Sequence, residues 1–180
     1  VFKRALKNQY VIVSVSYELS KNPKINTTYG AIQAEIEVMG VTEITVDTVS
    51  QAVMNIRRSK LPDPKELGNA GSFFKNPEVP QTILQKIQEQ YPNVPFYALP
   101  NGQVKIPAGW LIEQAGWKGK RFDAIGVHAK QALVLVHYGG GKGQDVANLA
   151  HEIQKDIATK LANEGVAIGF EVGEDKAIAL

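Results

Sequence analysis

The sequence predicts an α+β fold in which helices cover a small sheet, and three observations lead to this prediction. After residue 47 the expected elements run helix, loop, helix, helix, strand, helix, strand. Residues 133–136 are all apolar, as in a strand that is buried on both faces. Residues 144–164 repeat apolar side chains at the spacing of one helical face. No internal repeat interrupts this pattern.

The composition excludes several classes of protein. The 180 residues are 44% hydrophobic and 21% charged, which is typical of a soluble globular protein, and the net charge of +2 is too small to indicate nucleic-acid binding. No apolar run approaches the roughly 20 residues that cross a membrane. The absence of Cys excludes disulfides and thiolate chemistry. The His residues lack metal-ligand spacing, so we expect no metal site.

The first 46 residues are expected to contain strands. Residues 10–18 alternate along an extended chain, which predicts a strand, and the polar residues 21–29 predict a loop. Residues 34–38 alternate again, and residues 43–46 are short and β-branched. We therefore expect strands or irregular extended segments at both places.

Four helices are expected after this region. Asp47 or Thr48 is a suitable N-cap for the first helix, and Gly165 is a suitable C-cap for the last one. Proline at a first turn opens the second and third helices. The expected ranges are 47–59, 80–91, 106–116 and 144–164.

Two strands and two connections complete the expected fold. Residues 131–138 and 166–172 are predicted strands, because both are rich in β-branched and apolar residues. Residues 117–125 are basic and loop-like. Asn101-Gly102 predicts a tight turn.

The stretch from residue 68 to residue 77, GNAGSFFKNP, is the strongest candidate for chemistry. Glycine permits positive φ and close approach to the backbone, so Ser72 is expected on a tight turn with its hydroxyl forward. Phe73 and Phe74 would anchor that turn in a core. Such a loop could hold an anionic or carbonyl-bearing ligand and offer it a proton. The spacing alone favours a plain glycine-rich turn with a capping serine over such a site.

Six segments resemble the signature of the UDP-N-acetylenolpyruvoylglucosamine reductase (MurB) family. They follow in order and with family-like spacing over nearly the whole chain. They are residues 60–65 (KLPDPK), 68–77 (GNAGSFFKNP), 106–114 (IPAGWLIEQ), 117–119 (WKG), 126–135 (GVHAKQALVL) and 170–172 (FEV).

The resemblance implies a division of the chain. Residues 1–47 would be the C-terminal remnant of a FAD-binding domain and would contribute its trailing strands. Residues 48–172 would form the substrate-binding domain, and residues 173–180 would be a tail. The chain starts with Val and not with Met, so we expect a truncated or processed start. On this interpretation the N-terminal flavin domain is the missing partner, and the isolated chain is inactive or nearly so.

The family reaction that the resemblance implies is the reduction of UDP-N-acetylglucosamine enolpyruvate to UDP-N-acetylmuramate in peptidoglycan precursor synthesis. NADPH reduces FAD, a hydride then reaches C3 of the enolpyruvyl group, and C2 takes a proton. Both cofactors are implied by the resemblance, and so is a location in the bacterial cytoplasm. Neither a nucleic acid nor a membrane is expected as a partner.

Two residues match the family's catalytic positions. Ser72 would be the proton donor, and Glu171 would position or polarise the enolpyruvyl group. The family often has another acidic residue two positions before Glu171, and this chain has Gly169 there. An arginine of the flavin domain has no counterpart in this chain. Arg57 is a possible cofactor contact, although a position on a solvated helix face is the favoured interpretation.

Five residues match the family's contacts to the UDP-sugar. Ammonium groups neutralise a diphosphate, amides contact sugar or phosphate oxygens, and an aromatic ring packs on a nucleotide. The residues are Lys60, Asn76, Tyr97, Lys118 and Gln131. Without the resemblance, an isolated lysine is more simply a solvent-facing charge, and Tyr97 a loop anchor.

Two other functions stay open at this point. The chain could be a non-catalytic UDP-sugar-binding module that has lost the flavin half. It could also be an unrelated α+β domain in which the glycine-rich loop is only a turn. Residues 139–143 do not add a nucleotide-binding alternative, because they lack the glycine spacing of a phosphate loop and predict an exposed turn.

Overall fold

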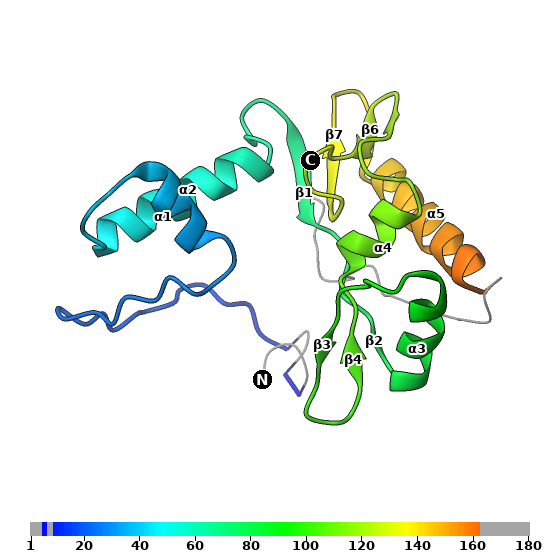
Figure 1. Cartoon of the computed structure of the whole chain (residues 1–180). Helices are drawn as coiled ribbons and strands as arrows, with labels where there is room; N and C mark the ends of the chain where they lie inside the picture. The colour runs from blue at the N-terminus through cyan, green and yellow to red at the C-terminus, as the bar shows by residue number, and fades with distance from the viewer. Residues whose placement is uncertain (1–4, 7–8, 163–180) are drawn as a thin grey trace. The chain divides into compact units, whose positions relative to one another are not determined.

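The computed structural model describes residues 5–6 and 9–162 of the chain (Figure 1). The chain divides into two compact units, Val1–Ile56 and Arg57–Leu180.

The first unit contains helix α1 (Ile32–Met39) and most of helix α2 (Val46–Lys60). Ile32 and Ile36 of α1 pack with Ala52 of α2 in a small core. A reciprocal pair opens α2, because the Thr45 N–H donates to Thr48 Oγ1 at 2.7 Å and the Thr48 N–H donates to Thr45 Oγ1 at 3.3 Å. This is the geometry of a capping box, with threonine in place of the usual Glu or Gln.

The strand predicted at residues 10–18 is wrong, and of the two segments expected as strands or irregular structure only residues 43–45 are irregular. Residues 10–18 have no regular secondary structure, and their side chains are exposed. A strand requires a neighbour for its N–H and C=O groups, and no strand of the described chain pairs with this segment. Residues 34–38 belong to α1, where Ile32, Ile36 and Met39 follow the helical repeat. Residues 43–45 precede α2 without strand structure, and residue 46 already belongs to the helix.

The second unit contains a four-stranded and a three-stranded sheet, and every strand pair is antiparallel. The four-stranded sheet has the order β1–β7–β6–β5, and the three-stranded sheet the order β2–β4–β3. Their bounds are β1 (Gly68–Ser72), β2 (Glu78–Val79), β3 (Tyr97–Ala98), β4 (Val104–Lys105), β5 (Arg121–Phe122), β6 (Ile125–Val127) and β7 (Val134–His137).

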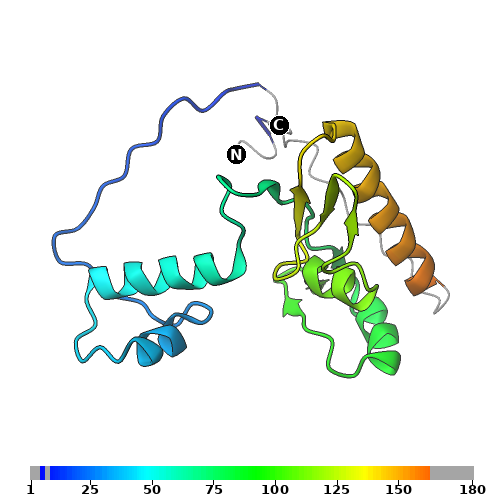
Figure 2. The same ribbon diagram turned by 90° about the horizontal axis from the view of Figure 1, so that it is seen from above.

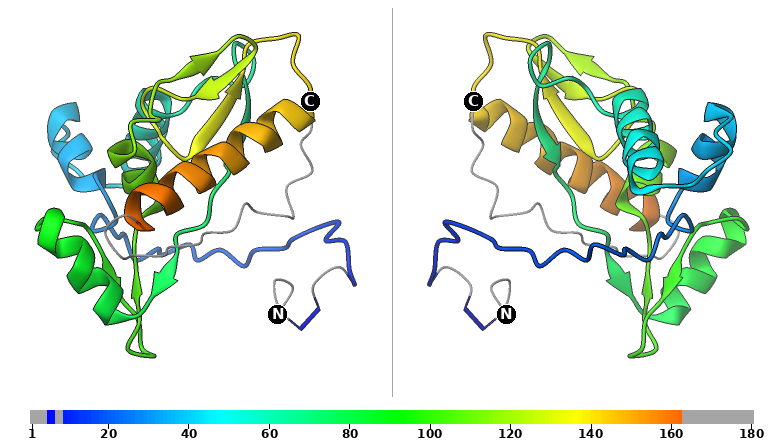
Figure 3. Two further views of the ribbon diagram at one scale, coloured as in Figure 1. Left: turned by 90° about the vertical axis from the view of Figure 1, so that its right-hand side faces the viewer. Right: turned by 90° about the vertical axis from the view of Figure 1, so that its left-hand side faces the viewer.

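Three helices accompany the sheets. Helix α5 (Gly143–Ala162) runs along the four-stranded sheet beside β6 (Figure 2). Helix α3 (Gln81–Gln90) lies next to the three-stranded sheet (Figure 3). Helix α4 (Ala108–Gln114) lies beside α5 in the same unit.

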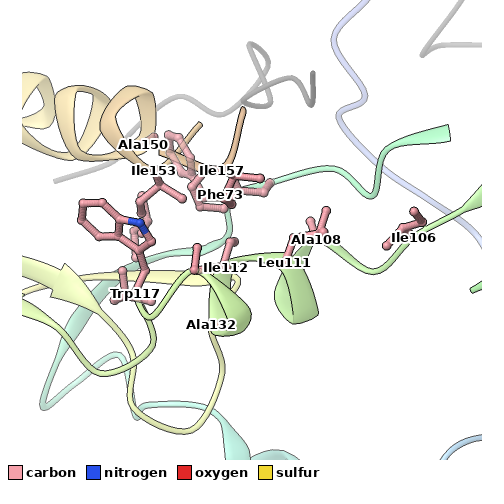
Figure 4. Packing of buried hydrophobic residues seen from close by; sticks show 14 of the residues in the cluster. Phe73, Ile106, Ala108, Leu111, Ile112, Trp117, Ala132, Ala150, Ile153 and Ile157 are labelled. Carbon is pink, nitrogen blue, oxygen red and sulfur yellow. The ribbon is translucent and has the colours of Figure 1, made fainter. Parts of the chain in front are cut away.

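One continuous hydrophobic core joins these elements. Figure 4 shows side chains from α4, from α5 and from the segment after β1 meeting in it. Leu84, Ile112 and Ile153, one from each helix, are almost completely buried. The core fixes the ends of α4 and β1, where the predicted site residues lie.

The α+β class and the elements of this unit were largely predictable. The four expected helices correspond to α2, α3, α4 and α5, and residues 131–138 contain the buried strand β7. The expected loop at 117–125 is wrong in part, because it holds β5 and the start of β6. The predicted strand 166–172 and the predicted C-cap Gly165 lie outside the described residues. The predicted domain boundary at residue 47 stays a prediction.

Candidate substrate-binding site

Ser72 is displayed by a β-bulge rather than by the predicted tight turn. Asn69 pairs with Val136 and Ser72 pairs with Val134, so β1 uses one more residue than β7 over the same distance. Gly71 accommodates the irregularity with φ +62°. The Asn69 Oδ1 atom accepts a hydrogen bond from the Gly71 N–H at 3.0 Å, which fixes the bulge locally. The Ser72 residue is exposed at the end of this strand.

The chain immediately after Ser72 is anchored in the core. The Phe73 N–H donates to the Leu133 carbonyl at 2.8 Å, and Phe73 and Phe74 are both buried. Their rings meet edge to face with centroids 5.8 Å apart. The prediction that these two rings anchor the segment is therefore confirmed.

Asn76 caps helix α4 from a distant part of the chain. Pro107 occupies the N-cap position and offers no side-chain acceptor. The Ala108 N–H instead donates to the Asn76 Oδ1 atom at 2.9 Å, so the cap comes from 32 residues upstream. This structural role was not predicted, and it leaves the Nδ2 group of Asn76 as the part of the side chain that a ligand oxygen would contact.

Gln131 lies at the same end of α4. Its Oε1 atom is 3.5 Å from the Leu133 N–H, a long hydrogen bond. A Cβ atom added to Gly109 would lie 3.7 Å from Oε1, so the first turn of α4 passes close to Gln131. The structure thus brings Asn76, Gln131 and the chain after Ser72 together at the N-terminal end of α4.

Tyr97 lies on the three-stranded sheet in a row with two charged residues. Tyr97 and Glu78 are both paired with Lys105, and directly paired residues project to the same face. Lys105 Nζ is 3.0 Å from Glu78 Oε1, and 60% of Tyr97 is exposed. Lys105 was missed from the sequence, because a two-residue strand carries no readable periodicity. The position of the Lys105 ammonium near the exposed Tyr97 ring could therefore be found only from the structure.

Lys118 follows the other end of α4. Its Nζ atom is 2.8 Å from Glu113 Oε1, so a ligand phosphate would compete with that carboxylate for the ammonium group. Lys60 and Arg57 are exposed residues in the last turn of α2. Arg57 borders an open hollow of about 450 Å³ between the end of α2 and the proline-rich turn at residues 61–66. Glu171, the second predicted catalytic residue, lies outside the described residues.

His128 differs from the other histidines in its surroundings. Its backbone N–H donates to the Val134 carbonyl, while its buried Nδ1 atom has no hydrogen-bond partner in the described part of the chain. Burial lowers the pKa of His128, and the charge of Lys130 lowers it further. The imidazole is therefore held neutral near pH 7.

The described residues contain neither a metal cluster nor a membrane-spanning helix. No group of three or more His, Asp or Glu side chains is placed there to hold a metal ion. No helix among residues 5–6 and 9–162 is long and apolar enough to cross a membrane.

Comparison with known proteins decides the family. The family model described as UDP-N-acetylenolpyruvoylglucosamine reductase, C-terminal domain, matches residues 63–172. The chain belongs to this reductase family. The resemblance inferred from the six sequence segments is confirmed, and the matched residues include Ser72, Asn76, Tyr97, Lys118 and Gln131.

Curated relatives in this reductase family support the assignment. A protein of Flavobacterium johnsoniae is 53% identical over 158 residues, which are 87% of this chain and 47% of the relative. A Pseudomonas putida protein is 47% identical over 91% of this chain and 48% of the relative. A Bacteroides fragilis protein is 44% identical over 96% of this chain and 50% of the relative. All three are named UDP-N-acetylenolpyruvoylglucosamine reductase. This chain spans about half the length of these reductases.

Proposed function

We propose that this chain supplies the UDP-sugar site and the proton donor of a UDP-N-acetylenolpyruvoylglucosamine reductase. The complete reaction would reduce UDP-N-acetylglucosamine enolpyruvate to UDP-N-acetylmuramate, with FAD and NADPH, in bacterial peptidoglycan synthesis. A cytoplasmic location is part of this proposal and follows from the resemblance. The observation that carries the proposal is family membership together with Ser72, which the bulge of β1 holds at an exposed position.

In the proposed mechanism Ser72 gives a proton to C2 of the enolpyruvyl group. A bound flavin would supply the hydride that reaches C3. A serine hydroxyl is a weak acid, so its position must be fixed and the charge that develops on the substrate must be stabilised. The Asn69–Gly71 hydrogen bond and the buried ring of Phe73 fix the backbone on both sides of Ser72. Glu171 is proposed to polarise the same group.

The UDP-sugar would bind through side chains at both ends of α4, on the three-stranded sheet and at the end of α2. The ammonium groups of Lys60 and Lys118 are proposed to neutralise the diphosphate, and Tyr97 to pack on the nucleotide. The amide groups of Asn76 and Gln131 are proposed to contact sugar or phosphate oxygens. The exposed ring of Tyr97 suits its task, and so does the surface position of Lys118, whose ammonium would exchange its pairing with Glu113 for the phosphate.

We do not assign a flavin pocket to the described residues. Arg57 is exposed beside an open hollow that Arg58, Asp63 and Glu66 also line, so two cations and two carboxylates leave it without a net charge that would attract an anionic cofactor. Arg57 suits at most a single contact to a flavin that is held mainly by other residues. For this reason we assign only binding and proton transfer to this chain.

A chimera tests the proposal. The N-terminal half of the Flavobacterium johnsoniae relative is joined to this chain, and NADPH oxidation that depends on the enolpyruvyl UDP-sugar is measured. We expect activity in the chimera, almost none in the isolated chain, and a loss of at least about 100-fold in kcat for Ser72→Ala. Ser20→Ala, in an exposed loop, is the matched control and should leave kcat unchanged.

Three results would contradict parts of the proposal. Activity of the isolated chain would contradict its role as a half-site. An unchanged kcat in Ser72→Ala would exclude Ser72 as the proton donor. A folded chimera that binds the UDP-sugar but does not reduce it would favour a non-catalytic binding module.

A further inference from the structure

Helix α5 holds the turn that follows α4 through one aspartate and one lysine. The indole Nε1–H of the buried Trp117 donates to Asp156 Oδ2 at 2.7 Å, across 39 residues of sequence. Lys160, one helical turn further on, places its Nζ 2.9 Å from the same carboxylate oxygen. The same Nζ donates to the Ala115 carbonyl at 2.7 Å. Two side chains of α5 therefore hold the chain on either side of Gly116.

The contact to Ala115 is electrostatically favourable. Ala115 is the C-cap residue of α4, and the last carbonyls of a helix carry partial negative charge and lack partners within the helix. The Lys160 ammonium supplies both the hydrogen bond and the opposite charge. Gly116 then turns the chain with φ +78°, and the Trp117 N–H returns to the Ile112 carbonyl at 3.1 Å. The backbone of this turn is thus fixed from α4 and from α5.

The carboxylate stays ionised in this arrangement. Burial acts to raise the pKa of Asp156, but hydrogen bonds from Lys160 and Trp117 outweigh it and hold the pKa below its usual value. The Lys120 ammonium, 4.8 Å from the centre of the Trp117 ring, adds a second cation nearby. The arrangement is therefore a charged network and not a single hydrogen bond.

The residue that directly follows this held turn is Lys118. We propose that Asp156 and Lys160 are positioning residues for Lys118: they fix Ala115 and Trp117, and so set where the Lys118 ammonium lies for an anionic ligand. This inference rests on the proposed role of Lys118 in binding the diphosphate. Neither Asp156 nor Lys160 is required to touch the ligand.

Amide hydrogen exchange tests the fixed turn without any ligand. In Asp156→Ala we expect the amides of Trp117 and Lys120 to exchange about tenfold faster, while amides in β7 keep their rates. Ile157→Val is the matched control, because it removes one methylene from the neighbouring buried residue of α5 and leaves the network in place. This control should not raise the exchange rates of the turn amides more than those of the amides in β7. Equal changes at the turn and in β7 of Asp156→Ala would overturn the proposal.

A double-mutant cycle tests the link to Lys118, with enolpyruvyl UDP-N-acetylglucosamine as the titrated ligand. We expect Kd to rise about tenfold in Lys118→Met and about threefold in Asp156→Ala. The double variant should stay near tenfold, because Asp156 acts through Lys118. Asp156→Asn, which retains an oxygen for the Trp117 indole, should recover part of the loss.

The possible outcomes of the cycle separate the two proposals. A double variant near thirtyfold would mean that Asp156 acts independently of Lys118 and would overturn this inference alone. An unchanged Kd in Asp156→Ala would do the same. An unchanged Kd in Lys118→Met would instead contradict the proposed binding site itself.

Discussion

The two units of this chain use similar apolar residues with very different results. In the unit Arg57–Leu180, two sheets and three helices bury their apolar faces in one core. In the unit Val1–Ile56 the described core is small and lies between two helices. Val11 and Val13 are 88% and 91% exposed there, whereas Val134 and Val136 are each 1% exposed in the second unit.

This contrast shows that an alternating sequence favours a strand, but that the strand forms only where a neighbouring strand pairs with it. Residues 10–18 have the composition and the alternation of a strand, but they lie beside no pairing strand in the described chain. Residues 134–136 are bonded on both sides, by β1 and by β6. We therefore expect the second unit to carry the measurable stability of the isolated chain.

Truncation of the core should separate the two units most clearly. Ile112→Ala in α4 removes a completely buried side chain and should lower the free energy of unfolding by about 2–5 kcal/mol. Val13→Ala, the matched truncation at an exposed position, should change it by less than about 0.5 kcal/mol. Urea unfolding followed by circular dichroism gives both values. Similar losses in the two variants would mean that residues 10–18 are buried in solution.

Alanine substitutions at two glycines should have different effects on stability, because an added Cβ atom would clash with the backbone at one site and make ordinary van der Waals contact at the other. A Cβ atom at Gly126 would lie 2.7 Å from the Lys120 carbonyl oxygen and 3.2 Å from the Arg121 Cα. Gly126→Ala should therefore force β5 and β6 apart and cost about 1–3 kcal/mol. At Gly109 the nearest atom is 3.4 Å away, and alanine favours a helix, so Gly109→Ala should be neutral or stabilising. Thermal unfolding of both variants makes the comparison, and equal losses would contradict it.

Removing the Asn76 cap of α4 should have a smaller effect on stability, and it should also weaken ligand binding. Asn76→Ala leaves the Ala108 N–H without its acceptor and should cost about 1 kcal/mol. Asn148→Ala is the control, since Asn148 makes only an exposed hydrogen bond to Gln144 within α5. Urea unfolding and ligand titration are measured on both. A loss of affinity in Asn148→Ala as large as in Asn76→Ala would argue against a specific role for Asn76.

Acidification should lower stability through His128 and Asp156. The folded state lowers the pKa of both groups, so the unfolded state takes up the proton first as the pH falls. The contribution of His128 to the free energy of unfolding is complete above about pH 6.5 and is lost below it. The contribution of Asp156 is lost below the ordinary pKa of an aspartate, near 3.8. His128→Gln should flatten the stability profile between pH 7 and pH 5.5, and Asp156→Asn below pH 4. Unchanged slopes in these variants would exclude the two groups as the cause.

The sequence allowed prediction of the features that depend on local repeats. The apolar stripes of α3 and α5, the buried run of β7 and the anchoring rings Phe73 and Phe74 all follow from neighbouring residues. The positive φ next to Ser72 was expected and is found at Gly71, but the predicted tight turn is a β-bulge, which depends on pairing with β7.

Features that join distant residues could not be predicted. The cap from Asn76 to Ala108 and the contact of Asp156 with Trp117 span 32 and 39 residues, and no local pattern marks either pair. The alternation of residues 34–38 was ambiguous, because a short apolar repeat fits a helix face as well as a strand. The pairing of Asp156 and Lys160 at i and i+4 was visible in the sequence, but it resembles an ordinary exposed pair.

If this chain already holds a binding surface for the UDP-sugar, calorimetric titration of the isolated chain should detect it. Enolpyruvyl UDP-N-acetylglucosamine is titrated at low salt into the wild-type chain, Lys118→Met and the exposed control Lys155→Met. We expect saturable binding in the micromolar range that weakens in Lys118→Met and is unchanged in Lys155→Met. Equal binding in all three proteins, or no saturable binding in the wild-type chain, would contradict this expectation.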